Sequence, residues 1–332
     1  MTKVMTDKLA EYFNTLDVPF SPSEFDFSQP VVASRIPLRQ CLGDDWQWLP
    51  GSSLNSPVKT ELASIKHIIA IASGKGGVGK STTTVNVARA LAAMGAKVGV
   101  LDADIYGPSV PLMLNRSGQQ PATHDGKIMQ PIESVEGIKA NSIGFLVADT
   151  DAAVWRGPMA SKAFMQLFNE TQWGELDYLL IDLPPGTGDI QLTLAQNIPL
   201  SGAVIVSTPQ DIALIDAQKA HKMFDKVNID SLGLIENMSI FVCGECGHES
   251  ALFGHEGAKQ YAQASSIPYL GALPLSVDIR QYMDDSEEQS LTQKNFSHFY
   301  EAVALRLAIQ LSGKAKQNYD KQQLQIPIQQ LQ

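Results

Sequence analysis

A glycine-rich segment is the first part of this 332-residue sequence whose residue types and spacing could do chemistry. Within Gly74–Ser81, two glycines separated by four residues are followed by Lys80 and the hydroxyl residue Ser81. This is the spacing of a phosphate-binding loop. Glycine backbone lets N–H groups surround phosphates without Cβ obstruction, Lys80 can bridge the β- and γ-phosphates, and Ser81 can ligate Mg²⁺. The segment therefore predicts a site for ATP and Mg²⁺.

The residues around this loop favour binding over the alternative, a glycine-rich turn that binds nothing. A predicted strand ends at Ser73, and a predicted helix over Thr82–Met94 can turn its N-terminal amides toward an anion. The predicted nucleotide-binding residues of the segment are Gly74, Lys75, Gly76, Gly77, Val78, Gly79, Lys80, Ser81 and Thr82.

Lys75 follows the first glycine directly, where an ordinary phosphate loop requires no cation. A cation there can reach a triphosphate bound in a facing copy of the chain and neutralise charge that develops during phosphoryl transfer, as an arginine finger does. The alternative is a solvated loop charge. The complete motif favours a catalytic Lys75 beside Lys80, and this interpretation predicts a homodimer.

Carboxylates follow two predicted apolar strands, over Lys97–Leu101 and Tyr178–Asp182. The carboxyl ends of parallel strands meet at one edge of a sheet, where the phosphate loop also lies. An aspartate after a strand is often only a helix cap or turn residue. Beside a phosphate loop, we expect Asp182 to hold Mg²⁺ through water and Asp104 to position the attacking water. Asp102 is the third candidate.

The segment Leu183–Asp189 combines prolines, which restrict the backbone, with glycines, which allow it to move. Such a segment next to a γ-phosphate predicts a nucleotide-dependent switch.

The elements that position these residues begin at His67, where short apolar strands start to alternate with amphipathic helices. This pattern is typical of an α/β fold with a mostly parallel, doubly wound sheet flanked by helices, here of the P-loop NTPase kind. An inserted antiparallel excursion is predicted between Gly126 and Gly144, with a turn at Asp125-Gly126. The predicted strands are Ile68–Ala72, Lys97–Leu101, Tyr178–Asp182, Ala203–Ser207, Leu232–Glu236 and Tyr269–Ala272.

Three regions follow from this pattern. Residues 1–60 form an N-terminal appendage that starts with a helical spacing of apolar residues and continues with prolines and little periodicity. Residues 61–312 form the ATPase domain, which contains a Cys-x-x-Cys pair. Residues 313–332 are polar and rich in glutamine, and Pro327 would interrupt a helix, so we expect a flexible tail.

Composition excludes several classes of function. The formal net charge of −10 opposes binding to nucleic acid or to anionic lipid. No apolar run approaches the roughly 20 residues of a membrane span, and the N-terminus lacks the apolar core of a secretion signal. Three cysteines in a chain of this length indicate a reducing compartment, so we expect a cytoplasmic protein.

Several strings together resemble the Mrp/ApbC-type iron–sulfur cluster carrier ATPases, a branch of the deviant-Walker-A group. The resemblance covers residues 60–310. It implies an ATP site at the interface of a two-fold dimer and recognition of adenine by Asn237, and it gives Arg156 no role. Many members begin with a small α+β domain, for which the first 60 residues are too short and too divergent. The strings are Gly74–Thr82, Leu101–Ser109, Trp155–Met159, Ile181–Asp189 and Cys243–Cys246.

Cys243 and Cys246 are two thiols at metal-ligand spacing. Iron–sulfur clusters are usually held by four thiolates, which two chains related by a two-fold axis would supply. We therefore expect a [4Fe-4S] cluster bridging two subunits. The alternatives are a redox pair, a tight loop, or a zinc site completed by His248 and His255 within one chain. We do not expect Cys41 to bind the cluster.

These observations favour an ATP-hydrolysing carrier that passes an iron–sulfur cluster to apoproteins. The first alternative is a spatial-organising ATPase that alternates between cytosol and membrane or DNA, but no basic amphipathic terminal helix is present. The second is a zinc-stabilised nucleotide-binding protein.

Overall fold

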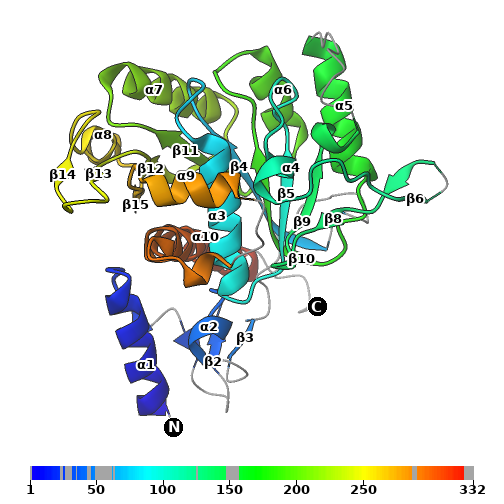
Figure 1. Ribbon diagram of the computed structural model, residues 1–332. Coiled ribbons are helices and arrows are strands. Elements are labelled where there is room, and N and C mark those ends of the chain that lie inside the picture. The colour runs from blue at the N-terminus through cyan, green and yellow to red at the C-terminus, as the bar shows by residue number, and fades with distance from the viewer. Residues whose placement is uncertain are drawn as a thin grey trace, which may run out of the picture.

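The computed structural model describes residues 2–22, 25–26, 32–34, 36–42, 46–48, 62, 64–124, 126–146, 157–285 and 290–324. Its centre is an eight-stranded sheet in the order β15-β12-β11-β4-β10-β5-β9-β8 (Figure 1). Every neighbouring pair is parallel except β8 and β9. The strands are β4 (Ile65–Ala72), β5 (Val98–Asp102), β8 (Ile132–Glu133), β9 (Lys139–Ser142), β10 (Leu176–Asp182), β11 (Gly202–Ser207), β12 (Ser231–Glu236) and β15 (Tyr269–Ala272).

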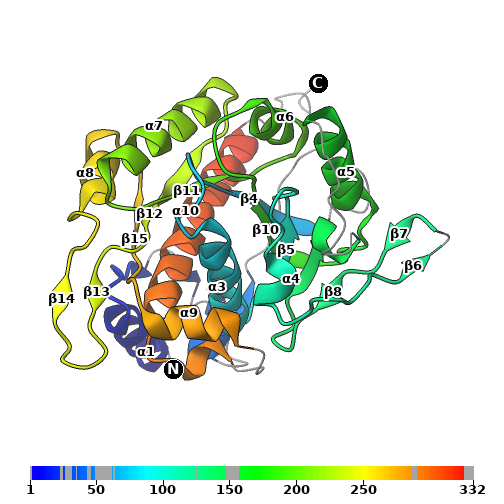
Figure 2. The same ribbon diagram turned by 45° about the horizontal axis from the view of Figure 1, so that its top comes forward.

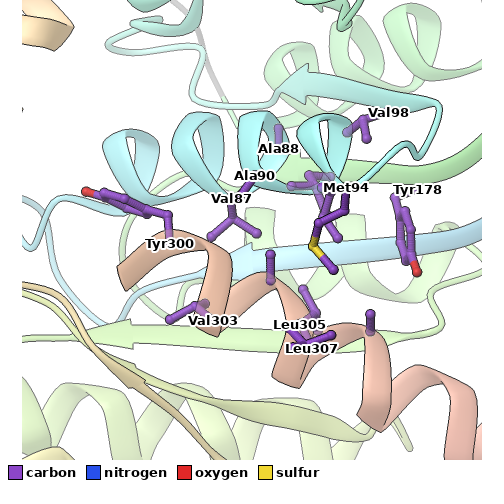
Figure 3. Close-up of a cluster of buried hydrophobic side chains, with 14 of the residues drawn as sticks. Val87, Ala88, Ala90, Met94, Val98, Tyr178, Tyr300, Val303, Leu305 and Leu307 are labelled. Carbon is purple, nitrogen blue, oxygen red and sulfur yellow. The ribbon is translucent and has the colours of Figure 1, made fainter. Parts of the chain in front are cut away.

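Both faces of this sheet are covered, as the sequence predicts. Successive residues of β4 point to opposite faces, so that Ile69 and Ile71 join one core cluster while Ile68 and Ala70 join another. Figure 3 shows the first cluster between α3 and α10. The helices of the sheet are α3 (Lys80–Ala93), α4 (Val110–Met113), α5 (Gly157–Glu170), α6 (Asp189–Asn197), α7 (Asp211–Lys226), α8 (Gly257–Ala264), α9 (Val277–Asp284) and α10 (Ser297–Leu324).

The N-terminal part is more ordered than the predicted helix followed by irregular chain. After α1 (Thr2–Thr15) come three short strands and a short helix, namely β1 (Phe25–Asp26), β2 (Val32–Ser34), α2 (Arg39–Leu42) and β3 (Trp46–Trp48). Buried side chains of this part, such as Phe13, belong to the same core cluster as Met94 at the end of α3. The Arg39 N–H donates to the Met94 carbonyl over 2.8 Å. This part therefore packs on the main domain at the end of α3 opposite the phosphate loop (Figure 1).

Two further segments differ from the sequence-based expectations. The predicted antiparallel excursion contains two such pairs, β6 (Thr123–His124) with β7 (Ile128–Met129) and β8 with β9, but β9 also pairs in parallel with β5, so that β8 and β9 belong to the main sheet. The last helix, α10, ends at Leu324 and does not stop at Gly313, where a flexible tail was expected. One glycine costs a helix only about 1 kcal/mol, and no proline lies between Gly313 and Pro327.

Candidate nucleotide site and cysteine hairpin

The phosphate loop lies between the end of β4 and the start of α3. Gly77 and Gly79 have φ angles of 79° and 78°, in the left-handed region that favours glycine. The loop surrounds one side of a cavity of about 210 Å³. The cavity is lined by Ser73, Lys75, Gly76, Gly77, Gly79, Lys80, Ser81, Thr82, Asp104, Ser109, Met113 and Pro185.

The structure brings Lys80, Ser81 and Asp182 together. Lys80 Nζ lies 2.8 Å from Asp182 Oδ1, and Ser81 Oγ donates to Asp182 Oδ2 over 2.5 Å. Thr84, which lies outside the predicted set of site residues, donates its hydroxyl to Asp182 Oδ1 over 2.8 Å. Its position three residues after Ser81, on the same helix face, is the signal that could have identified it. The Ser81 and Asp182 oxygens are hard donors of the kind that Mg²⁺ prefers.

Asp102 and Asp104 have different surroundings. The buried Asp102 carboxylate accepts backbone N–H groups of Asp104 and Val110 and the Ser142 hydroxyl over 3.0, 3.2 and 3.1 Å. Asp102 therefore fixes the connection from β5 into α4. Asp104 lines the cavity, and its partial burial raises the pKa of its carboxyl. Of these two aspartates, Asp104 is the one placed to contact a ligand in the cavity.

Lys75 and the start of α7 lie side by side. Lys75 Nζ donates to Gln210 Oε1 over 3.3 Å. A Cβ at Gly74 would overlap the backbone of Asp216 on α7, so this close approach requires glycine. In the predicted switch, Pro185 lines the cavity, and the Gly186 N–H donates to the Ser73 carbonyl over 3.0 Å.

Some predicted features lie outside the described residues. Trp155 and Arg156 are among them, as are the side chain of Asp189 and the turn residue Asp125.

The cysteine pair lies between the strands of a hairpin, β13 (Phe241–Val242) and β14 (Glu249–Ser250), which branches off after β12 (Figure 2). The Cys243 N–H donates to the His248 carbonyl over 3.0 Å, which closes the loop between the strands. Backbone N–H groups of Cys246 and Glu245 donate to the Cys243 sulfur, and they lower the pKa of the Cys243 thiol. Both cysteines are free.

The single-chain zinc alternative receives no support from this geometry. Among the described residues, which include Cys243, Cys246, His248 and His255, no group of three or more His, Cys, Asp or Glu side chains is placed to hold a metal ion. Each chain therefore offers two thiols as ligands at this hairpin.

Because its pKa is lowered, the Cys243 thiol is expected to react with iodoacetamide at lower pH than an ordinary cysteine. The thiolate is the nucleophile, so the alkylation rate should rise with pH and reach half its maximum below the pH found for the same chain unfolded in urea. The measurement uses metal-free Cys41→Ala/Cys246→Ser protein. If the half-maximal pH of the folded protein were equal to or higher than that of the unfolded chain, the result would contradict the effect of the Glu245 and Cys246 amides on the Cys243 thiol.

Asn237, at the end of β12, is buried against the phosphate loop. Its Nδ2 donates to the Val78 carbonyl over 2.8 Å, and its own N–H donates to the Ser207 carbonyl over 2.7 Å. The contact that the structure gives this side chain is thus with the loop backbone.

An open parallel sheet whose phosphate loop leads into a helix, with a strand-terminal aspartate beside the loop, defines a P-loop nucleoside triphosphatase. Residues 64–308 match the family described as ParA: NUBPL iron-transfer P-loop NTPase. The chain belongs to this family. None of the helices in the described part of the chain has the length and apolar character of a membrane span.

Known proteins agree with this assignment. The chain is 52% identical to an iron–sulfur cluster carrier protein of Escherichia coli strain K12, over 80% of this chain and 73% of that protein. A nucleotide-binding protein of Archaeoglobus fulgidus, solved with ADP, is 38% identical with a TM-score of 0.61, covering 71% of this chain and 94% of that chain. The MinC:MinD cell division complex of Aquifex aeolicus, at 22% identity and TM-score 0.53 over 73% of this chain and 95% of that chain, shares the fold alone.

Proposed function

We propose that this protein hydrolyses ATP and carries an iron–sulfur cluster that it passes to apoproteins. The observation that carries the proposal is the presence, in one chain, of an assembled phosphate site and of two free thiols on a hairpin with a lowered Cys243 pKa. Its similarity to iron–sulfur cluster carrier proteins supports the same conclusion. Free thiols as ligands also favour a reducing compartment, the cytoplasm.

In this proposal, each residue of the nucleotide site has a defined task. The loop amides and Lys80 bind the phosphates, and Ser81 and Asp182 hold Mg²⁺. Asp104 orients the attacking water from the cavity wall. The base contacts Asn237, as the family resemblance implies. The lysine and the metal ion stabilise charge that develops on the transferred phosphoryl group.

A homodimer would complete both sites. Lys75 can act on the nucleotide of the facing subunit, and two cysteine pairs would give the four thiolates of a bridging [4Fe-4S] cluster. The edge of the sheet near the cavity also exposes large apolar side chains, which are typical of an interaction surface. They are Tyr106, Leu112, Ile212 and Ile215, exposed by 60%, 58%, 65% and 51%. ATP binding would close this interface and change the lability of the cluster.

Metal and sulfide analysis after anaerobic purification tests the proposal. We expect about four irons and four sulfides per dimer. One zinc per chain, lost in a His248→Ala variant, would favour the zinc-stabilised alternative and refute the carrier. A dimer that forms with ATP and cluster, measured by light scattering, would support the bridging arrangement, and a fully competent monomer would refute it.

The spatial-organising alternative is tested by pelleting with DNA or with anionic liposomes in the presence of ATP. The net charge of −10 predicts that the protein stays in the supernatant. ATP-dependent pelleting with either surface would count against the carrier as the sole function.

A further inference from the structure

Asn237 is held on two sides at the carboxyl edge of the sheet. Its side chain is only 6% exposed. The backbone N–H is bonded to Ser207 of β11, so the position of the residue is fixed by the sheet. The side-chain amide then reaches across to the carbonyl of Val78 in the phosphate loop. Asn237 thus connects the sheet to the backbone of the phosphate loop.

This hydrogen bond orients a loop amide. The Val78 carbonyl and the Gly79 N–H belong to one planar peptide unit, and no described peptide bond is cis. In a trans peptide the N–H points opposite to the carbonyl. With the carbonyl directed at Asn237, the Gly79 N–H points away from Asn237, and Gly79 lines the cavity. Asn237 therefore helps to set the direction of an N–H that a phosphate can use.

Positions 79 and 237 also fit each other sterically. A Cβ at Gly79 would overlap Asn237 Nδ2, and the φ of 78° already favours glycine there. The loop can approach Asn237 this closely only because residue 79 has no side chain.

Asn237 also begins the root of the cysteine hairpin, by which we mean residues 237–240, the connection between β12 and β13. Met238 follows in the left-handed region with φ 55°, a conformation that non-glycine residues keep only when their surroundings fix it. Ser239 then donates its N–H to the Leu273 carbonyl over 3.0 Å, and the Leu275 N–H donates to the Ile240 carbonyl over 2.9 Å. The short connection from the loop contact to Cys243 is therefore held by hydrogen bonds.

We propose that Asn237 is a positioning residue that orients the phosphate loop and ties it to the root of the cysteine hairpin. Rearrangement of the loop around a triphosphate is then transmitted, through the hydrogen bond from the Asn237 side chain to Val78, to a corner of the chain that leads within six residues to a proposed cluster ligand. The effect on the hairpin rests on the proposed carrier function, whereas the effect on the loop does not.

The first experiment separates loop orientation from recognition of the base. Affinities for ATP, GTP and inorganic triphosphate are measured with Mg²⁺ for the wild type and Asn237→Ala. Loss of one hydrogen bond that orients the loop should weaken all three ligands, inorganic triphosphate included, by about tenfold, and loss of a contact with the base would weaken ATP further. A loss confined to ATP, or no loss, would overturn the proposal.

A matched control removes the same kind of bond elsewhere. Asn169 Nδ2 donates to the Met165 carbonyl within α5, so Asn169→Ala should leave all these affinities unchanged. Thermal unfolding of both variants shows that each is folded.

The second experiment measures transfer of iron from the purified holoprotein to a chelator, with and without saturating ATP. In Asn237→Ala, the iron content should stay as in the wild type. The ratio between the rates of iron release with and without ATP should approach one. An unchanged ratio would overturn the tie to the hairpin. If the wild type holds no iron, the carrier function fails instead, and the affinity measurements still decide the role in the loop.

Discussion

Lys80→Ala is expected to abolish ATP-dependent work. The Lys80 ammonium lies at the wall of the cavity, 2.8 Å from Asp182 Oδ1 and 3.3 Å from Ser81 Oγ, where it can meet the β- and γ-phosphates. Removing one such stabilising group lowers turnover by about 10²- to 10³-fold. The measurement is phosphate release at saturating ATP, and normal turnover would refute the phosphate-loop assignment.

Lys97→Ala is the matched control for this prediction. Lys97 forms an exposed ion pair with Glu175 over 2.8 Å, away from the cavity, so its loss should leave turnover unchanged. In Lys80→Ala, the buried Asp182 carboxylate loses its cation but keeps the Ser81 and Thr84 hydroxyls. Lower thermal stability is therefore expected, and Lys80→Gln serves as a second variant whose folding and turnover are measured alongside.

Cys243→Ala is expected to lose the cluster while ATP binding persists. The substitution removes two of the four thiolates that a two-fold dimer would offer, so iron should fall from about four per dimer to near zero. Cys243 is not among the residues that line the nucleotide cavity, so ATP affinity should change little. Iron analysis and ATP titration on anaerobic protein check both parts.

Cys41→Ala provides the control for iron loss. Cys41 lies in the N-terminal part, where its thiol is directed at the Lys8 carbonyl 3.8 Å away. Its removal should leave the iron content unchanged. Unchanged iron in Cys243→Ala would count against the bridging model. Iron loss in Cys41→Ala would indicate that the N-terminal part contributes to iron binding.

The sheet and the nucleotide site could be predicted because their signals are local. Buried parallel strands appear as short apolar runs, and all six predicted strands are present with ends shifted by at most three residues, as for β4 at Ile65–Ala72. The meeting of Lys80, Ser81 and Asp182 follows from the motif and from the shared carboxyl edge of β4 and β10. The family and the carrier class were anticipated from the resemblance of several strings, among which Cys243–Cys246 points to the cluster.

The remaining features depend on contacts between distant parts of the chain. Nothing in the sequence around Asn237 indicates that its side chain reaches Val78, which lies 159 positions away. The pairing of β9 with β5 likewise adds a long-range partner to the local antiparallel pair of β8 and β9. The short strands of the N-terminal part, two or three residues each, are too brief to produce a visible alternation.

Helix α3 has one end at the phosphate loop and the other at the N-terminal part. Its 14 residues span about 21 Å. A protein that binds α1 or the short strands beside it would therefore lie at a distance from the nucleotide cavity, and it would not compete with a second subunit for the proposed dimer interface. The architecture would leave this end of the molecule accessible to a client protein while the proposed dimer interface lies at the other end.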